Sequence, residues 1–175
     1  RRLLRADRQT QAGKRKNQLG VEASPEKIAQ VAADRGIDSV AFTYNDPIVF
    51  AEYAIDTAEA CRALGIHPIA VTAGYMSAEA RPDFYAAMDA ANIDLKGFTP
   101  EFYQWLQGDL ETVKTNIRLA VEAGCHVEVT TLVIPGKNDG EEGMEKEARW
   151  LASLSPDLPL HISRYFPRWH LDLPP

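Results

Sequence analysis

Apolar runs of strand length alternate with helical stripes along the chain from residue 24 onward. In the stripes, apolar residues recur every three to four positions, which is the spacing of one helix face. Helices are predicted at about residues 24–35, 47–64, 77–88, 100–107, 109–123 and 140–154, and strands at 39–44, 67–72, 91–96, 126–134 and 159–163. Because a helix precedes each strand, right-handed crossovers predict a parallel sheet, in either a partial barrel or a doubly wound layer.

Capping residues stand where several of these helices should begin. Ser24 precedes a proline and an acid, which together are typical of a helix start. Ser77 and Asp109 are predicted to cap later helices in the same way. Asn45 or Asp46 is predicted to cap the helix that follows the first strand, which begins with a proline.

Composition fits one globular domain, because 45% of the 175 residues are apolar and no apolar run has the length of a membrane-spanning helix. Residues 1–20 hold seven of the 19 Lys and Arg but one of the 25 Asp and Glu, which leaves 12 basic and 24 acidic residues. This basic arm lacks the interleaved aromatics of a nucleic-acid binder and the apolar stretch of a signal peptide. We expect a poorly ordered basic segment over 1–20, a folded domain over 21–175, and neither a nucleic-acid nor a membrane partner.

The two cysteines, Cys61 and Cys125, are far apart and lie in helix-like surroundings. Buried thiols in a reducing cytoplasm are the expectation, and a disulfide or a metal-binding pair is the alternative. The four histidines lack the spacing of zinc ligands, and only His161 is placed near a site. These features predict a cytoplasmic protein with no metal held by its own side chains.

Polar motifs close the predicted strands. They read Thr43-Tyr44-Asn45-Asp46-Pro47, Thr72-Ala73-Gly74-Tyr75, Asp94-Leu95-Lys96-Gly97, Ile134-Pro135-Gly136-Lys137-Asn138-Asp139 and Ser163-Arg164-Tyr165-Phe166-Pro167. The carboxyl ends of parallel strands meet at one edge of a sheet or one mouth of a barrel, where α/β proteins bind ligands. The motifs therefore predict one shared ligand site.

Within these motifs, the hydroxyl and amide groups of Thr43, Tyr44 and Asn45 are suited to a ligand's amine or carboxylate. Asp94 and Lys96 are two apart on a strand, so their side chains share a face. Three interpretations of this pair remain open: a structural ion pair, a pair that grips a zwitterionic ligand, or a Schiff-base lysine with a lowered pKa.

The remaining strand-end residues each have an ordinary structural explanation beside the functional one. Gly74 and Gly136 would let backbone approach a ligand, but glycine after a strand is also common turn chemistry. Asn138 fits a turn as well as a site. Arg164 would hold a carboxylate or phosphate, or form an ion pair at the rim.

In this order and spacing, the motifs resemble the radical S-adenosylmethionine (SAM) enzymes related to pyruvate formate-lyase-activating enzyme. They are most similar to the branch called AmmeMemoRadiSam-system radical SAM enzymes, over residues from about 11 to 175. The resemblance implies a partial (βα)6 barrel, in which the five predicted strands correspond to strands two to six. It also implies an iron–sulfur [4Fe-4S] cluster that reduces SAM to a radical, which abstracts hydrogen from a substrate such as a protein.

The resemblance further implies where SAM would lie. The Tyr44-Asn45-Asp46-Pro47 position contacts the methionine amino group, the Asp94 and Lys96 positions lie in the same pocket, and the strand ending at Pro135-Gly136 passes near the adenosine. The predicted cofactor-binding residues are Thr43, Tyr44, Asn45, Asp46, Thr72, Gly74, Asp94, Lys96, Pro135, Gly136, Asn138 and Arg164.

The cluster needs three thiolates spaced C-x3-C-x2-C on one loop. The third would fall near Leu4, and residues 1–10 do not resemble the family. Cys61 and Cys125 supply neither the number nor the spacing. The hypothesis from the sequence is a truncated or misread family member, which an in-frame cysteine motif in the upstream coding DNA would support and a long unrelated frame would contradict.

Three functions remain open on this basis. The first is a radical SAM enzyme family member whose 175 residues alone are inactive. The second is a non-redox SAM-binding or scaffold protein that uses the strand ends. The third is a Schiff-base lyase that uses Lys96.

Overall fold

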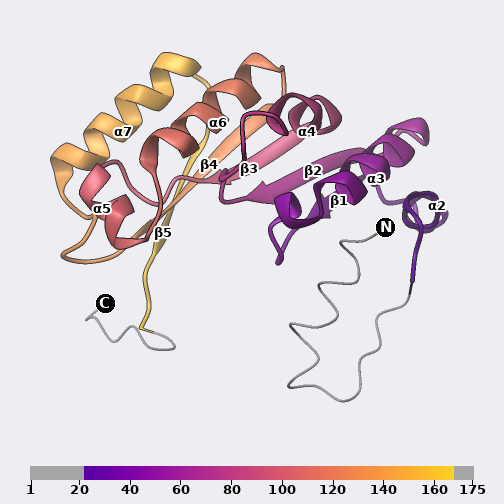
Figure 1. Cartoon of the computed structure of the whole chain (residues 1–175), viewed down its shortest axis with the longest axis horizontal. Helices are drawn as coiled ribbons and strands as arrows, with labels where there is room; N and C mark the ends of the chain where they lie inside the picture. The colour runs from indigo at the N-terminus through magenta and orange to yellow at the C-terminus, as the bar shows by residue number, and fades with distance from the viewer. Residues whose placement is uncertain (1–21, 168–175) are drawn as a thin grey trace.

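Helices and strands alternate along residues 22–167, the part of the chain that the computed structural model describes (Figure 1). The predicted basic segment 1–20 and the tail from 168 lie outside the described residues. In chain order the elements are α2 (Pro25–Asp34), β1 (Ser39–Phe42), the 3-10 helix η1 (Pro47–Phe50), α3 (Ala51–Ala63), β2 (His67–Thr72), α4 (Arg81–Ala87), β3 (Ala90–Asp94), α5 (Pro100–Trp105), α6 (Leu110–Glu122), β4 (His126–Val133), α7 (Glu141–Leu154) and β5 (Leu160–Arg164). Among the described residues, no helix is long and apolar enough to span a membrane.

The five strands form one parallel sheet in the order β1-β2-β3-β4-β5. This order separates the two architectures that the sequence leaves open. A doubly wound sheet reverses its strand order at a switch point, whereas each strand here pairs with the next one along the chain. The prediction of a partial barrel with five parallel strands is confirmed.

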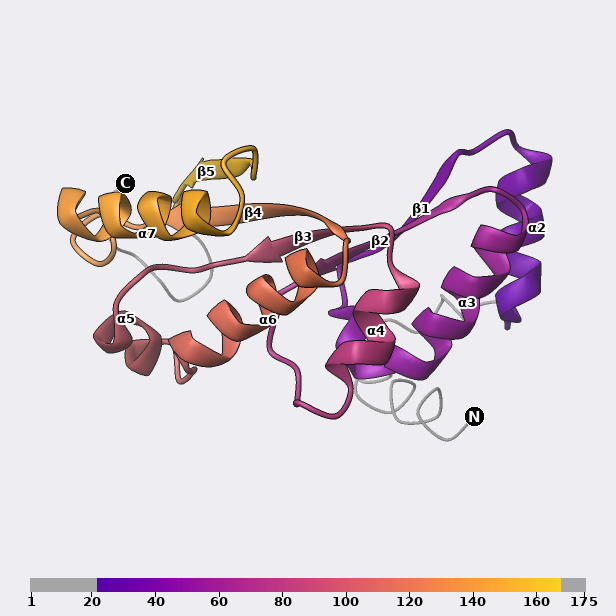
Figure 2. The same cartoon turned by 90° about the horizontal axis from the view of Figure 1, so that it is seen from above.

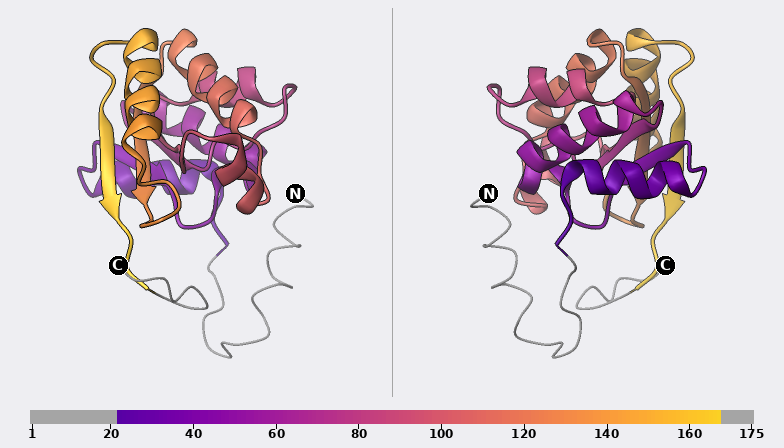
Figure 3. Two further views of the ribbon diagram at one scale, coloured as in Figure 1. Left: turned by 90° about the vertical axis from the view of Figure 1, so that its left-hand side faces the viewer. Right: turned by 90° about the vertical axis from the view of Figure 1, so that its right-hand side faces the viewer.

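Helices pack against one face of the sheet, and α3, α4 and α6 lie on the same side of the strands (Figure 2). On β4, the buried side chains of Val127, Val129 and Thr131 alternate with the half-buried side chains of Glu128 and Thr130. Because side chains alternate across a strand, the sheet has one face in the core and one polar face. Figure 3 shows β5 at the outer edge of the sheet, beside α7.

The caps predicted at Ser24 and Asp109 are confirmed. Ser24 Oγ accepts a hydrogen bond from Lys27 N at 3.3 Å, and Asp109 Oδ2 accepts one from Thr112 N at 2.7 Å. Each cap satisfies a backbone N–H that has no partner inside its helix.

The predicted cap at Ser77 is wrong, because α4 begins at Arg81 after Ala80, with no side-chain cap. Pro82 explains the later start. A helix beginning near residue 78 would place Pro82 where its missing N–H is needed, whereas the first turn of a helix tolerates proline.

The predicted continuous helix over 47–64 is divided. Pro47–Phe50 is a 3-10 turn, and its last residue, Phe50, has a non-helical φ of −133° directly before α3 begins. The predicted Asp46 cap is confirmed, because its Oδ1 accepts from Ile48 N at 3.2 Å. Short 3-10 turns are frequent at the ends of α-helices, and here one carries the chain from the strand end to the long helix.

Candidate functional site

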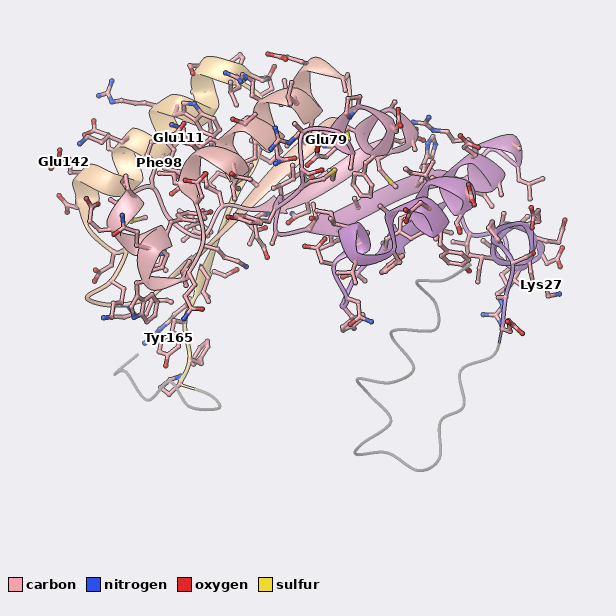
Figure 4. All side chains as sticks on the ribbon, in the orientation of Figure 1. Lys27, Glu79, Phe98, Glu111, Glu142 and Tyr165 are labelled. Atoms are coloured by element: carbon pink, nitrogen blue, oxygen red, sulfur yellow. The ribbon has the colours of Figure 1, made fainter. Side chains whose placement is uncertain are left out.

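The carboxyl ends of all five strands lie along one edge of the sheet, as predicted, and one polar motif follows each strand along this edge. Asp94 is opposite Thr130, and Val133 is opposite Arg164 in the ladder. Tyr165, labelled in Figure 4, follows β5 at this edge. The individual side chains, however, divide into those that tie the loops together and those that remain exposed.

Tyr44 forms the most unusual turn at this edge. Its φ is +70°, and Asn45 N donates to Thr43 O at 3.0 Å, which closes a three-residue turn around it. Positive φ is rare and strained for a bulky residue, and such strain concentrates at functional sites. The Tyr44 side chain is fully exposed at 102%, so packing does not hold it in this conformation.

Asp46 ties the first two strand ends together. Its Oδ1 accepts from Thr72 Oγ1 at 2.8 Å, and its Oδ2 accepts from Ala73 N at 2.9 Å, in addition to the cap on Ile48 N. Thr72 Oγ1 in turn accepts from Gly74 N at 3.1 Å. The carboxylate of Asp46 is thus engaged by the fold.

Gly74 is required for packing. Its φ is +65°, and a Cβ there would lie 2.7 Å from Ile93 Cγ2. Real carbon contacts are not that short, so Ile93 or the Gly74 backbone would have to shift to admit a larger residue. Backbone geometry and close packing therefore explain why glycine stands at position 74.

Asp94 and Lys96 form an ion pair at the end of β3, with Lys96 Nζ 2.5 Å from Asp94 Oδ2. The two side chains are 31% and 40% exposed, respectively. A Schiff-base lysine is usually activated by apolar surroundings or a neighbouring cation, and Lys96 has a carboxylate partner instead. A half-exposed pair of opposite charges is open to a zwitterionic ligand.

Asn138 joins the ends of β3 and β4. Its Nδ2 donates to Lys96 O at 2.7 Å and to Leu132 O at 2.8 Å, and its Oδ1 accepts from Ile134 N at 2.6 Å. These three bonds explain Asn138 as a structural residue. Gly136, by contrast, has a φ of +70°, and among the described residues no atom beyond Gly136 and its two chain neighbours lies within 4 Å of the point where a Cβ would stand, so space is open there.

Aromatic and cationic side chains line the far end of the edge. Arg164 lies over the Phe166 ring at 5.6 Å, and Lys137 Nζ lies 4.9 Å from the Trp105 ring centroid. Arg164 is exposed at the end of β5. Within residues 22–167 it has no ion pair, so the predicted rim ion pair is not seen there.

Three buried residues beneath this edge, Tyr103, Thr131 and Glu147, are not among the site residues that the sequence predicts. Tyr103 OH accepts from Lys96 N at 3.1 Å, and burial raises the pKa of Tyr103 to about 12. Thr131 Oγ1 lies between Leu95 O and the Glu147 carboxyl. Glu147 had one sequence signal, because it stands four residues before the buried Leu151 on the same helix face.

The cysteines do not fit an iron–sulfur cluster. Cys61 lies on α3 and Cys125 directly before β4, and both are free and buried, as predicted. Cys125 thus follows a helix rather than lying within one. Burial raises the pKa of both thiols, that of Cys125 to about 12. Among residues 22–167, no group of three His, Cys, Asp or Glu could hold a metal ion.

Comparison with known protein families shows the family of the chain. Residues 7–148 match the family model of the Radical SAM superfamily. The chain belongs to this superfamily. The match covers the sheet from β1 to β4 and more than half of α7, and it confirms the resemblance that the strand-end motifs carry.

Relatives of this radical SAM chain are consistent with the assignment. An uncharacterized protein of Methanocaldococcus jannaschii is 33% identical over 156 residues, which cover 88% of this chain and 46% of that protein. The chain thus spans about half the length of the curated relative it matches. A domain of pyruvate-formate lyase-activating enzyme from Bacteroides vulgatus is 25% identical, with a TM-score of 0.59, over 78% of this chain and 84% of that domain.

A third similar structure agrees in fold alone. SuiB from Streptococcus suis, solved with bound S-adenosylmethionine, is 14% identical with a TM-score of 0.69, over 89% of this chain and 37% of that chain. The same protein is also known bound to its precursor peptide SuiA.

Proposed function

We propose that the chain forms the SAM-binding edge of a radical SAM barrel of the activating-enzyme kind. We further propose that its 175 residues alone bind SAM without cleaving it. One observation carries the proposal: the fold leaves polar groups exposed at the carboxyl edge of a radical SAM sheet. Within residues 22–167, the side chains of Thr43, Tyr44 and Asn45 make no hydrogen bond to the rest of the fold.

The exposed groups complement SAM chemically. The methionyl part of SAM carries an ammonium and a carboxylate, and the Asp94–Lys96 pair presents the opposite charge to each. The turn around Tyr44 exposes hydroxyl and amide groups, and the open backbone at Gly136 allows close approach. The loops behind these groups would be held by hydrogen bonds of Asp46, Thr72 and Asn138. Gly74 would contribute through its close packing.

The residues present do not fit a [4Fe-4S] cluster, which supplies the electron for cleavage of SAM when it is bound. The chain has two buried thiols on separate segments, whereas such a cluster needs three thiolates on one loop. We expect that anaerobic incubation with iron and sulfide leaves iron well below four per chain and no cluster absorbance. A stoichiometric cluster would contradict this part of the proposal.

SAM binding is tested by calorimetry on the wild-type chain and on two matched variants. Lys96→Met removes an ion-paired lysine at the site, and Lys146→Met removes one on α7, where Lys146 Nζ lies 2.6 Å from Glu142 Oε1. We expect SAM affinity to fall about tenfold or more in Lys96→Met and to stay unchanged in Lys146→Met, since a bond to a charged group contributes about 1.5–3 kcal/mol. No heat with wild-type protein at millimolar SAM would contradict the proposal.

Calorimetry tests one of the alternatives from the sequence, and chemical labelling tests another. A scaffold protein without a ligand would release no heat with SAM. A Schiff-base lyase would be labelled at Lys96 by borohydride with small aldehydes. The ion pair with Asp94 favours ligand gripping over this chemistry.

The substrate class of the whole protein is a further part of the proposal. We propose a protein or peptide substrate, supported by the similarity to an activating-enzyme domain. Radical transfer to a candidate peptide needs a loaded cluster, so it must be tested on a cluster-bearing assembly that includes this chain.

A further inference from the structure

The backbone that carries Lys96 is held by side chains from three other segments. Lys96 N donates to Tyr103 OH of α5 at 3.1 Å, and Asn138 Nδ2 of the β4–α7 loop donates to Lys96 O at 2.7 Å. Thr131 Oγ1 of β4 lies 2.8 Å from Leu95 O. These bonds fix the backbone at the end of the strand, and so they fix the point from which the Lys96 side chain extends.

Thr131 has a second partner, the carboxyl group of Glu147. Glu147 lies on α7 and is 3% exposed, and its Oε1 is within hydrogen-bonding distance of Thr131 Oγ1. A hydroxyl carries one proton, so Thr131 cannot donate both to Leu95 O and to a carboxylate. Both contacts are satisfied when Glu147 is a neutral acid that donates to Thr131, which then donates to Leu95 O.

The surroundings of Glu147 also favour the neutral acid. Burial raises the pKa of Glu147 above its ordinary 4.5, against the opposing effect of the Thr131 bond. Titratable and charged groups on the elements around it include Tyr103 of α5, Asp94 at the end of β3 with Lys96 after it, Lys114 of α6, and the Glu128–His161 pair of β4 and β5. The last pair lies on the opposite face of the sheet from Thr131.

We propose that neutral Glu147 is a positioning residue that holds Leu95 and Lys96 in place through Thr131, so that ligand binding at Lys96 weakens when Glu147 loses its proton. An ionised Glu147 draws the Thr131 proton to itself. The buried Leu95 carbonyl then loses its donor, and an unpaired buried carbonyl is unfavourable. For SAM as the ligand, this inference rests on the proposed function.

The protonation of Glu147 should also make the free energy of unfolding depend on pH. Between 4.5 and the raised pKa, the folded chain holds a proton on Glu147 that the unfolded chain has lost. The free energy of unfolding therefore falls as the pH rises through this interval. Glu147→Gln should remove this slope, because glutamine is neutral at every pH and its amide can donate to Thr131.

The first experiment measures SAM affinity against pH in the wild-type chain, in Glu147→Gln and in a control. Glu145→Gln is the control, because Glu145 lies on the same helix but is exposed and paired with Arg149. We expect wild-type and control affinities to fall about three- to tenfold through the Glu147 titration. The affinity of Glu147→Gln should stay constant. A pH profile that is the same in all three chains would overturn the positioning role.

The second experiment needs no ligand. Carbon-labelled glutamate gives the carboxyl titration of Glu147 by NMR, and the amide signals of Leu95 and Lys96 report the strand end. We expect these amides to shift with the Glu147 midpoint, above 4.5, and to lose that shift in Thr131→Val. A Glu147 midpoint at or below the ordinary value would overturn the proposal.

The two experiments separate the two proposals. Amides that follow Glu147 in a chain that binds no SAM would support the positioning role and contradict the proposed function. SAM binding with a flat pH profile would support the function and overturn the positioning role.

Discussion

Replacing Asp46 with alanine should loosen the link between the first two strand ends. The carboxylate accepts three hydrogen bonds, from Ile48 N, Thr72 Oγ1 and Ala73 N, at 3.2, 2.8 and 2.9 Å. Asp46 is half-buried, so each bond is taken at the low end for a lost partner, about 1 kcal/mol. The free energy of unfolding should therefore fall by about 3 kcal/mol, which corresponds to a melting temperature about 6–12 °C lower.

Two further variants sharpen this test. Asp46→Asn keeps an acceptor for Ile48 N and Thr72 but turns an N–H toward Ala73 N, so its loss should be about half as large. Asp56→Ala is the matched control, because Asp56 is exposed on α3 and should change stability by less than about 0.5 kcal/mol. Urea unfolding measures all three. Asp46→Ala and Asp56→Ala with equal stability would refute the reasoning.

Three more predictions concern the strand ends and the core. Tyr44→Gly should raise the free energy of unfolding, measured in urea, by about 1 kcal/mol, because the strain of the φ of +70° is relieved and no packing is lost. A lower free energy of unfolding would contradict the strain, and the SAM affinity of this variant should fall. Gly74→Ala should lower stability by about 2–3 kcal/mol, because its Cβ meets Ile93, whereas Gly136→Ala, in open space, should lower it by about 1 kcal/mol. The Cys125 thiol, whose pKa is raised by burial to about 12, should react with a disulfide reagent only on unfolding; fast reaction in the native chain would contradict its burial.

Much of the fold follows from local sequence patterns. Ser24 and Asp109 cap their helices as predicted, because a short polar side chain before an apolar stripe satisfies its helix locally. The choice between barrel and doubly wound layer does not follow from such patterns. It depends on which strands pair, and the order β1 to β5 is a tertiary property.

The errors in the helix boundaries have local causes that the pattern could have shown. Pro82 delays the start of α4, although Ser77 has the composition of a cap. Phe50 divides the predicted second helix, although apolar residues continue through it. In both cases backbone geometry overrides side-chain periodicity.

The candidate site is less predictable than the fold. The sequence places Asp46, Asn138 and Lys96 at one edge, but it does not say which side chains the fold itself engages. Asp46 and Asn138 turn inward to neighbouring strands, because unpaired backbone groups there need partners. Glu147 belongs to none of the motifs, and only tertiary packing places it against Thr131.

SAM binding at the carboxyl edge of this sheet is the central proposal for this chain. An NMR titration of the isotope-labelled chain with SAM tests it most directly, because each amide reports its own surroundings. We predict the largest amide shifts at residues 43–46, 94–97, 134 and 136–138. No shifts at millimolar SAM, or shifts confined to the outer pocket between α4 and α6 that Arg81, Tyr85 and Glu122 line, would contradict the claim.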